Sequence, residues 1–149
     1  MARSNGDPET TLLYLMKQVE SAVRAHLDEA LRPAGVTALQ YTALTVLERH
    51  PNYTSAQLAR HSFVTAQTMA DMVTTLEGRS LVERHRDPAD RRRLVLSLTK
   101  EGRALLRKYR GEVAKLETRM LTGVAPSAAR SLRQTMITCR ENLDEHPRR

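Results

Sequence analysis

A short arginine-rich stretch carries side chains that could bind an anion. Between positions 79 and 93 of this 149-residue sequence there are six arginines and only three acidic residues. Guanidinium groups bind phosphate, and an arginine at a loop tip can enter the narrow minor groove of DNA. Asp90 precedes Arg92 by two residues, a spacing that lets the carboxylate brace this guanidinium. We therefore predict contacts to a polyanion from Arg84, Arg91 and Arg92, with Asp90 bracing Arg92.

Polar residues at helical spacing precede this stretch. A helix is predicted from position 65 or 66 to position 79, and its apolar face consists of Met69, Met72, Val73 and Leu76. Its outward face presents Gln67, whose amide can pair with adenine, and Thr68, which suits a thymine methyl group or a phosphate. Asp71 lies on the same face. Thr65 and Ser55 stand at predicted helix starts, where hydroxyls and backbone amides bind phosphate.

The surrounding elements are read from apolar periodicity and capping signals. Thr37 with Gln40, and Thr54 with Gln57, form capping boxes that open two further helices, which end near positions 50 and 60. A first helix is predicted from Asp7 as N-cap to position 31, a long one follows Thr99, and a last one begins at Ser127. Short segments at 81–86 and 94–98 flank the charged tip at 87–93 as a β-hairpin. The fold class is therefore mainly α, a winged helix-turn-helix with a hairpin wing.

Composition narrows the function classes. The formal net charge is +7, with 24 Lys and Arg against 17 Asp and Glu, which favours a polyanionic partner. We find no signal peptide, no apolar run of about 20 residues and a single cysteine, so we expect a cytoplasmic protein without a membrane span or an intrachain disulfide. No nucleophile or phosphate-loop motif is present, and the histidines are scattered, so we expect no enzyme, no cofactor and no metal site.

In order and spacing, the chain resembles the MarR (multiple antibiotic resistance regulator) family from about residue 9 to 145. The similar stretches are Gly35–Gln40, Leu76–Arg84, Asp87–Arg93 and Leu98–Gly102. The resemblance implies a homodimer with intertwined first and last helices, a wing arginine, here Arg92, held by Asp90, and repression relieved by a small ligand or by oxidation. Asp71 departs from the family pattern, because many relatives carry a cation there. It could contact cytosine N4, form an ion pair or point away.

A dimer also has a physical argument. The outer helices carry apolar stripes. A helix-turn-helix lobe of roughly 60 residues is too small to bury these stripes by itself. We predict one domain over 1–149, in which helices at 7–31 and 100–146 form the dimer and 37–99 form the DNA-binding lobe. Pairing two lobes would set their recognition helices about 34–36 Å apart, matching a palindromic site on double-stranded DNA.

Three residues are candidates for an effector cleft that the resemblance places beside the dimerisation helices. An anionic aromatic effector needs cations and hydroxyl donors, and the candidates are His26, Tyr41 and Tyr109. Cys139 lies in line with Leu132, Met136 and Leu143, which predicts a buried structural thiol, with a redox role through an intersubunit disulfide as the alternative. A non-specific architectural DNA binder and a helical partner-binding protein remain open as other functions.

Overall fold

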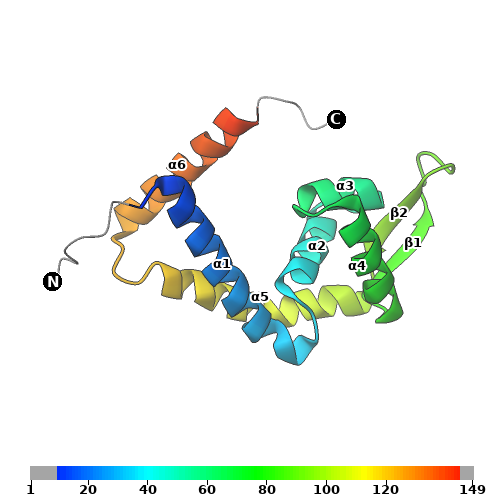
Figure 1. Cartoon of the computed structure of the whole chain (residues 1–149). Coiled ribbons are helices and arrows are strands. Elements are labelled where there is room, and N and C mark those ends of the chain that lie inside the picture. The colour runs from blue at the N-terminus through cyan, green and yellow to red at the C-terminus, as the bar shows by residue number, and fades with distance from the viewer. Residues whose placement is uncertain (1–9, 145–149) are drawn as a thin grey trace. The chain divides into compact units, whose positions relative to one another are not determined.

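Helices dominate the computed structural model, which describes residues 10–144 (Figure 1). The described residues up to Val113 form one compact unit, and those from Ala114 onward form a second. The elements are α1 (Leu12–Leu31), the 3-10 helix η1 (Arg32–Ala34), α2 (Ala38–Arg49), α3 (Ser55–His61), α4 (Ala66–Gly78), β1 (Val82–Arg86), β2 (Leu94–Leu98), α5 (Lys100–Met120) and α6 (Pro126–Leu143). The predicted fold class, a winged helix-turn-helix, is confirmed.

Local capping decides where most of the helices begin. Thr37 and Thr54 both form the expected reciprocal capping boxes, with Gln40 and Gln57 at the third helical position. The predicted N-cap of α1, Asp7, lies outside the described residues. Within them the helix begins at Leu12, with the Thr11 hydroxyl accepting from the backbone amide of Tyr14. The last helix begins at Pro126 rather than Ser127, because proline fits the first turn, where its missing N–H has no partner to lose.

The core of the first unit lies between α2, α3, α4 and the hairpin. Its fully buried side chains include Leu44, Leu58, Met69 and Val73, so the predicted apolar face of α4 is turned inward. Leu31 at the end of α1 and Leu106 in α5 complete this cluster. Asp28 of α1 accepts a hydrogen bond of 2.6 Å from the first backbone amide of α2, at Ala38, which fixes the junction between these two helices.

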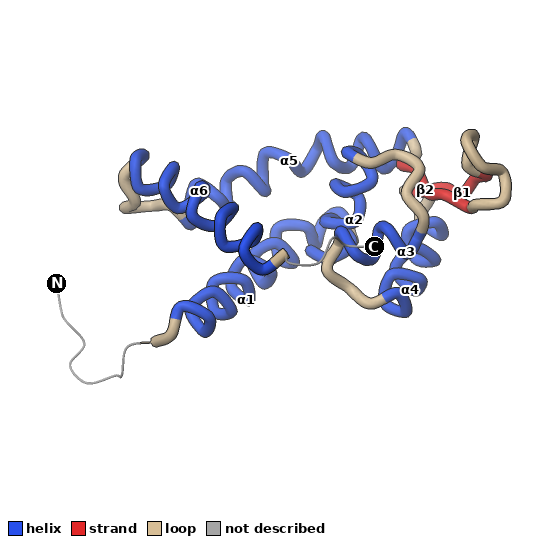
Figure 2. Tube along the Cα trace, turned by 90° about the horizontal axis from the view of Figure 1, so that it is seen from above, coloured by secondary structure: helices blue, strands red, loops and turns tan. Residues whose placement is uncertain are grey.

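The two strands form the antiparallel hairpin drawn in red in Figure 2, with Val82 opposite Leu98 and Arg86 opposite Leu94. The α2–α3 loop adds a further antiparallel bridge between Tyr53 and Leu96, in which the Leu96 amide donates to the Tyr53 carbonyl oxygen at 2.8 Å. Leu94, at the outer end of β2, is exposed, whereas both Val95 and Leu96 are buried. Exposed and buried side chains therefore do not strictly alternate along β2, as they would in a regular half-buried strand.

The base of the hairpin packs tightly against the start of α5. Thr99 caps this helix, as predicted, by accepting from the amide of Gly102 at 3.0 Å. A Cβ atom at Gly102 would overlap the carbonyl oxygen of Leu81, so only glycine lets the two segments approach this closely. No helix within residues 10–144 has the length and apolar character needed to cross a membrane.

Candidate nucleic-acid interface

Helix α4 presents a polar face next to the hairpin. Gln67, Thr68, Asp71 and Thr74 are exposed, while the apolar residues of the opposite face are buried in the core. This is the predicted orientation, and it follows from the 3.6-residue period of the apolar positions. In a helix-turn-helix pair, the N-terminal residues of the second helix reach base edges in the major groove. Gln67 and Thr68 occupy this part of α4.

The start of α4 is ordered by two threonines. The Thr65 hydroxyl accepts from the backbone amide of Thr68 at 3.1 Å and donates to the Thr68 hydroxyl oxygen at 3.0 Å. Since Thr68 is the acceptor in this second bond, its own hydroxyl hydrogen can be donated outward to a phosphate or a base. Ser55 lies at the first position of α3 and is half-buried. Both predicted phosphate-binding hydroxyls are thus at helix starts in the same unit.

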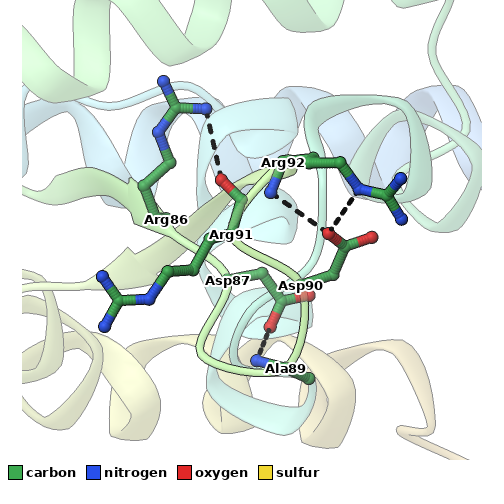
Figure 3. A network of polar contacts seen from close by, with 6 residues as sticks. All are labelled: Arg86, Asp87, Ala89, Asp90, Arg91 and Arg92. Atoms are coloured by element: carbon green, nitrogen blue, oxygen red, sulfur yellow. Dashed lines mark hydrogen bonds and ion pairs between the residues drawn. The ribbon is translucent and has the colours of Figure 1, made fainter.

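The hairpin tip holds Arg92 in a defined orientation (Figure 3). Oδ1 of Asp90 accepts from both the Nε and the backbone amide of Arg92, each at 3.1 Å. The hydrogen bond from the Arg92 side chain, followed by that from its amide, lowers the pKa of Asp90 from its ordinary value. The Arg92 side chain is nevertheless 92% exposed, so its terminal nitrogens remain accessible. The predicted brace between these two residues is present.

Turn contacts inside the tip keep its shape. Oδ1 of Asp87 accepts from the amide of Ala89 at 2.9 Å, and the amide of Arg93 donates to the carbonyl oxygen of Asp90 at 3.0 Å. Such turns, in which an aspartate bonds its own backbone two residues on, are typical of tight loops. Figure 3 shows the guanidinium groups of Arg91 and Arg92 on opposite sides of this loop. The two arginines are therefore presented in different directions.

Three of the other arginines of this stretch hold the lobe together, while Arg86 donates to the carbonyl oxygen of Arg91 within the hairpin tip at 3.5 Å. Arg79 donates to the carbonyl oxygens of Gly35 and Ala34 at 2.6 and 2.7 Å, and so ties the end of α4 to the turn before α2. Arg84 pairs with Glu77 at 2.7 Å, and Arg93 donates to Gln57 at 3.3 Å. Sequence reasoning missed these bracing roles. Because these arginines are chemically identical, the local sequence does not show which of them form contacts within the lobe and which are exposed.

A second link joins the hairpin to the α2–α3 loop. Nε2 of His85 on β1 lies 2.9 Å from Oδ1 of Asn52, and the backbone of Asn52 donates to Leu96 on β2 at 3.1 Å. Together with the Arg93–Gln57 hydrogen bond, these contacts connect the wing to the helix-turn-helix at two points. The wing and α4 thus belong to one packed unit, and the position of Arg92 relative to Gln67 is set by folding.

Asp71 is exposed on α4, and its carboxylate takes part in none of the ion pairs seen among residues 10–144. Of the three possibilities open for it, the ion pair within the chain is therefore not observed. Its outward position beside Gln67 and Thr68 leaves a base contact to cytosine N4 or an orientation away from DNA. An aspartate at this point repels phosphate, so its neighbours must supply the attraction.

The effector candidates lie in different surroundings. Tyr41 is buried in the core, and Tyr109 and His26 are half-buried. Burial raises the pKa of Tyr41 above its ordinary value, an effect that the nearby Arg110 guanidinium opposes and the Glu48 carboxylate reinforces. Sequence reasoning missed Arg110, whose Nη2 donates to both carboxylate oxygens of Glu48, at 2.7 and 2.9 Å. An anionic effector needs a cation, and two lie close to candidate tyrosines: Arg110 near Tyr41, and Lys108, whose Nζ is 5.7 Å from the centre of the Tyr109 ring.

Cys139 is exposed in the chain, so the prediction of a buried thiol is wrong for the single subunit. The apolar residues in line with it on α6 are exposed as well, which explains why a stripe that reads as a core face leaves the thiol accessible. Its redox role stays a prediction, which non-reducing electrophoresis after peroxide treatment tests. Within residues 10–144, no group of three His, Cys, Asp or Glu side chains is placed to hold a metal ion.

The pair α3–α4, the hairpin behind it and the exposed Arg92 define a winged helix-turn-helix DNA-binding protein. Comparison with known proteins narrows this class. The model of the MarR family matches residues 36–94. The HTH-type transcriptional repressor Rv2887 of Mycobacterium tuberculosis is 30% identical over 128 residues, which cover 86% of this chain and 92% of the relative. The chain belongs to the MarR family, whose members are DNA-binding transcriptional regulators and not enzymes.

Solved structures agree with this assignment. The transcriptional repressor CouR bound to a 23-mer DNA duplex has a TM-score of 0.78 at 27% identity, covering 87% of this chain and 92% of that one. Rv2887 in complex with DNA has a TM-score of 0.72 at 28% identity, covering 88% and 98%. The complex of Rv2887 with p-aminosalicylic acid has a TM-score of 0.73 at 29% identity, covering 87% and 98%.

Proposed function

We propose that this chain is a homodimeric, sequence-specific transcriptional repressor that binds a palindromic promoter site. The observation that carries the proposal is the pairing, within one packed unit, of an exposed polar α4 face with an Arg92 guanidinium oriented by Asp90. Reading two grooves from one rigid lobe fixes the register of the protein on its duplex. Such a regulator acts where the chromosome lies, so we propose a cytoplasmic location.

Each site residue has a distinct task in this proposal. Gln67 and Thr68 read base edges in the major groove, with Asp71 beside them as a contact to cytosine or as a residue that excludes other bases. Arg92 enters the minor groove next to the half-site, where A·T-rich tracts concentrate negative potential. The remaining contacts go to phosphates. They come from Ser55, Thr65, Arg91 and Arg84, which engages Glu77 through its Nε and can donate to a phosphate from its terminal nitrogens.

The proposed partner of the terminal helices is a second copy of this chain. Large apolar side chains are exposed on α1, at Leu12, Leu15, Met16 and Val19, and on α6, at Leu132, Met136 and Leu143. Apolar area of this kind, in stripes at helical spacing, favours burial at an interface. We propose that residues 7–31 and 100–146 form the dimer and that 37–99 form the DNA-binding lobe. The two-fold axis of such a dimer matches an inverted repeat.

One experiment tests both parts of the proposal. The purified protein is first sized by light scattering, with a dimer expected at micromolar concentration. It then selects duplexes from a randomised pool, and the selected site is challenged with excess random DNA. A conserved inverted repeat that resists competition supports the proposal. A monomer, or equal affinity for selected and random duplexes, refutes it, and the second result would favour an architectural DNA binder.

We also propose that an anionic aromatic compound releases the repressor from its site. The supporting observations are the Arg110 guanidinium beside Tyr41 in this chain and the p-aminosalicylic acid bound by the relative Rv2887. His26 and Tyr109 are the further candidates for the contact surface. Salicylate and related phenolic acids, titrated into the complex of protein and selected duplex, should raise the DNA dissociation constant. No change across a broad panel of such compounds refutes this part.

A further inference from the structure

Phe63 occupies an unexpected place in the turn between α3 and α4. It is the sole phenylalanine of the sequence, which has no tryptophan, and its side chain is 78% exposed. Its backbone is in the left-handed region, with φ of 61°. The core of the first unit therefore gains little from the ring, although phenylalanine is one of the side chains that usually contribute most to a core.

The backbone at this position favours glycine. Helix α3 is followed by Ser62 as C-cap, and the amide of Val64 donates back to the carbonyl oxygen of Ala59 at 3.2 Å. This is the pattern of a helix end in which the residue after the C-cap turns left-handed, a role that glycine fills most often. A bulky residue with positive φ is strained, and such strain is found where a side chain has a task outside folding.

The location indicates what the task is. Phe63 precedes Thr65, the N-cap of α4, by two residues. When a helix-turn-helix docks, the first helix crosses the DNA backbone and the N-terminal end of the second enters the major groove. A turn between these two ends faces the edge of the groove. An exposed aromatic ring there meets carbon–hydrogen surfaces of DNA, namely thymine methyl groups and deoxyribose.

We propose that Phe63 is a DNA-contacting residue whose ring packs on the apolar surface of the duplex at the edge of the major groove. The inference rests on the proposed function and adds a contact to it that none of the polar site residues supplies. The strained turn holds the ring outward and in place. A bulky residue is thus kept at a left-handed position where glycine would be less strained, because the ring contributes to the affinity for DNA.

The test compares stability with DNA affinity in the full-length protein. Phe63→Gly relieves the strain and removes the ring, so its melting temperature should equal or exceed that of wild type. Its affinity for the duplex selected by the wild-type protein should fall by about tenfold or more, because two rings lose their apolar contacts. Phe63→Tyr keeps the aromatic surface and should bind within about threefold of wild type, less than the tenfold that corresponds to 1.4 kcal/mol.

Ser80 offers a matched control. It is also exposed and left-handed, with φ of 59°, and it lies in the loop between α4 and β1, outside the proposed contacts. Ser80→Gly should raise the melting temperature and leave DNA affinity unchanged. Replacing thymidine by deoxyuridine, one position at a time, separates the two surfaces. A loss that wild type shows and Phe63→Gly does not identifies a methyl contact, and the absence of any such position identifies deoxyribose.

Two results would overturn the inference. Unchanged affinity in Phe63→Gly would show that the ring does not contact DNA. A loss in Phe63→Tyr equal to that in Phe63→Gly would show that affinity does not depend on the aromatic surface, because tyrosine keeps that surface. Both are distinct from failure of the proposed function. In the first case wild type still prefers its selected duplex and Arg92→Ala still loses affinity, whereas failure of the proposed function removes the preference in wild type itself.

Discussion

Replacing Arg92 by alanine separates a DNA contact from a structural role. The side chain is 92% exposed, and Asp90 is its partner in an ion pair at 3.1 Å. An exposed pair of this kind contributes about 0–1 kcal/mol to stability, so the melting temperature should hardly change. The loss should fall on DNA binding. If each wing arginine contributes about 1–2 kcal/mol to the complex, two wings contribute about 2–4 kcal/mol, or roughly a 30- to 1,000-fold change in affinity.

The assay is a titration of the selected duplex, followed by fluorescence anisotropy, at several salt concentrations. Arg92→Ala should also flatten the dependence of log K on log salt by about 0.9 for each phosphate charge no longer neutralised. Arg24→Ala is the matched control, because it removes the same charge from an exposed ion pair, with Glu20 on α1. Wild-type affinity in Arg92→Ala, or an equal loss in Arg24→Ala, would refute a specific wing contact.

Asp90→Ala tests the brace by itself. The variant keeps the Arg92 charge and removes a negative one, so binding to random DNA should stay equal or become tighter. Binding to the selected duplex should weaken, since the guanidinium is no longer oriented by two hydrogen bonds to one carboxylate oxygen. The ratio of specific to non-specific affinity should therefore fall. An unchanged ratio would mean that Asp90 does not position Arg92 on DNA.

Three further predictions concern the scaffold. Gly102→Ala should lower stability by about 1–3 kcal/mol, because its Cβ overlaps the Leu81 carbonyl oxygen, while Gly111→Ala, in the same helix with open space around it, should raise the melting temperature; similar melting curves for both would contradict the packing. Ser62→Ala should stabilise the protein by about 1 kcal/mol, since the buried Ser62 hydroxyl has no hydrogen-bond partner among residues 10–144, and a lower melting temperature would show otherwise. The raised pKa of Tyr41 means that its neutral form is favoured in the folded state. The contribution of this group to stability is fully present below about pH 10 and is lost as the pH rises through the folded pKa. Tyr41→Phe should remove that part of the decline in alkaline chemical denaturation, and identical pH profiles would refute the assignment.

Local signals predicted much of the framework. The capping boxes at Thr37 and Thr54 involve side chains three residues apart, and the buried face of α4 follows from a repeat within a single helix. The Asp90–Arg92 brace also spans two residues only. Interactions over so few positions depend on local backbone geometry, which the residue types themselves favour.

Other features of the site could not be predicted in this way. The six arginines of the wing region look alike in sequence, yet Arg79 reaches carbonyl groups 44 and 45 positions away. Arg110 pairs with Glu48 across 62 positions, which placed a cation near Tyr41 that sequence reasoning did not name. The exposure of Cys139 was missed because an apolar stripe on a helix indicates burial without saying whether its own chain supplies the cover.

The sequence by itself determined the helices, the hairpin, the polar face of α4 and the Asp90–Arg92 pair, because each depends on neighbours within one or two turns of the chain. Only the tertiary structure decided which arginines brace the lobe, how the wing is linked to the α2–α3 loop, and that Phe63 turns outward in a strained conformation. Packing brings together residues that are distant in the chain, and the positions that result follow from the shape of the whole core rather than from any local pattern.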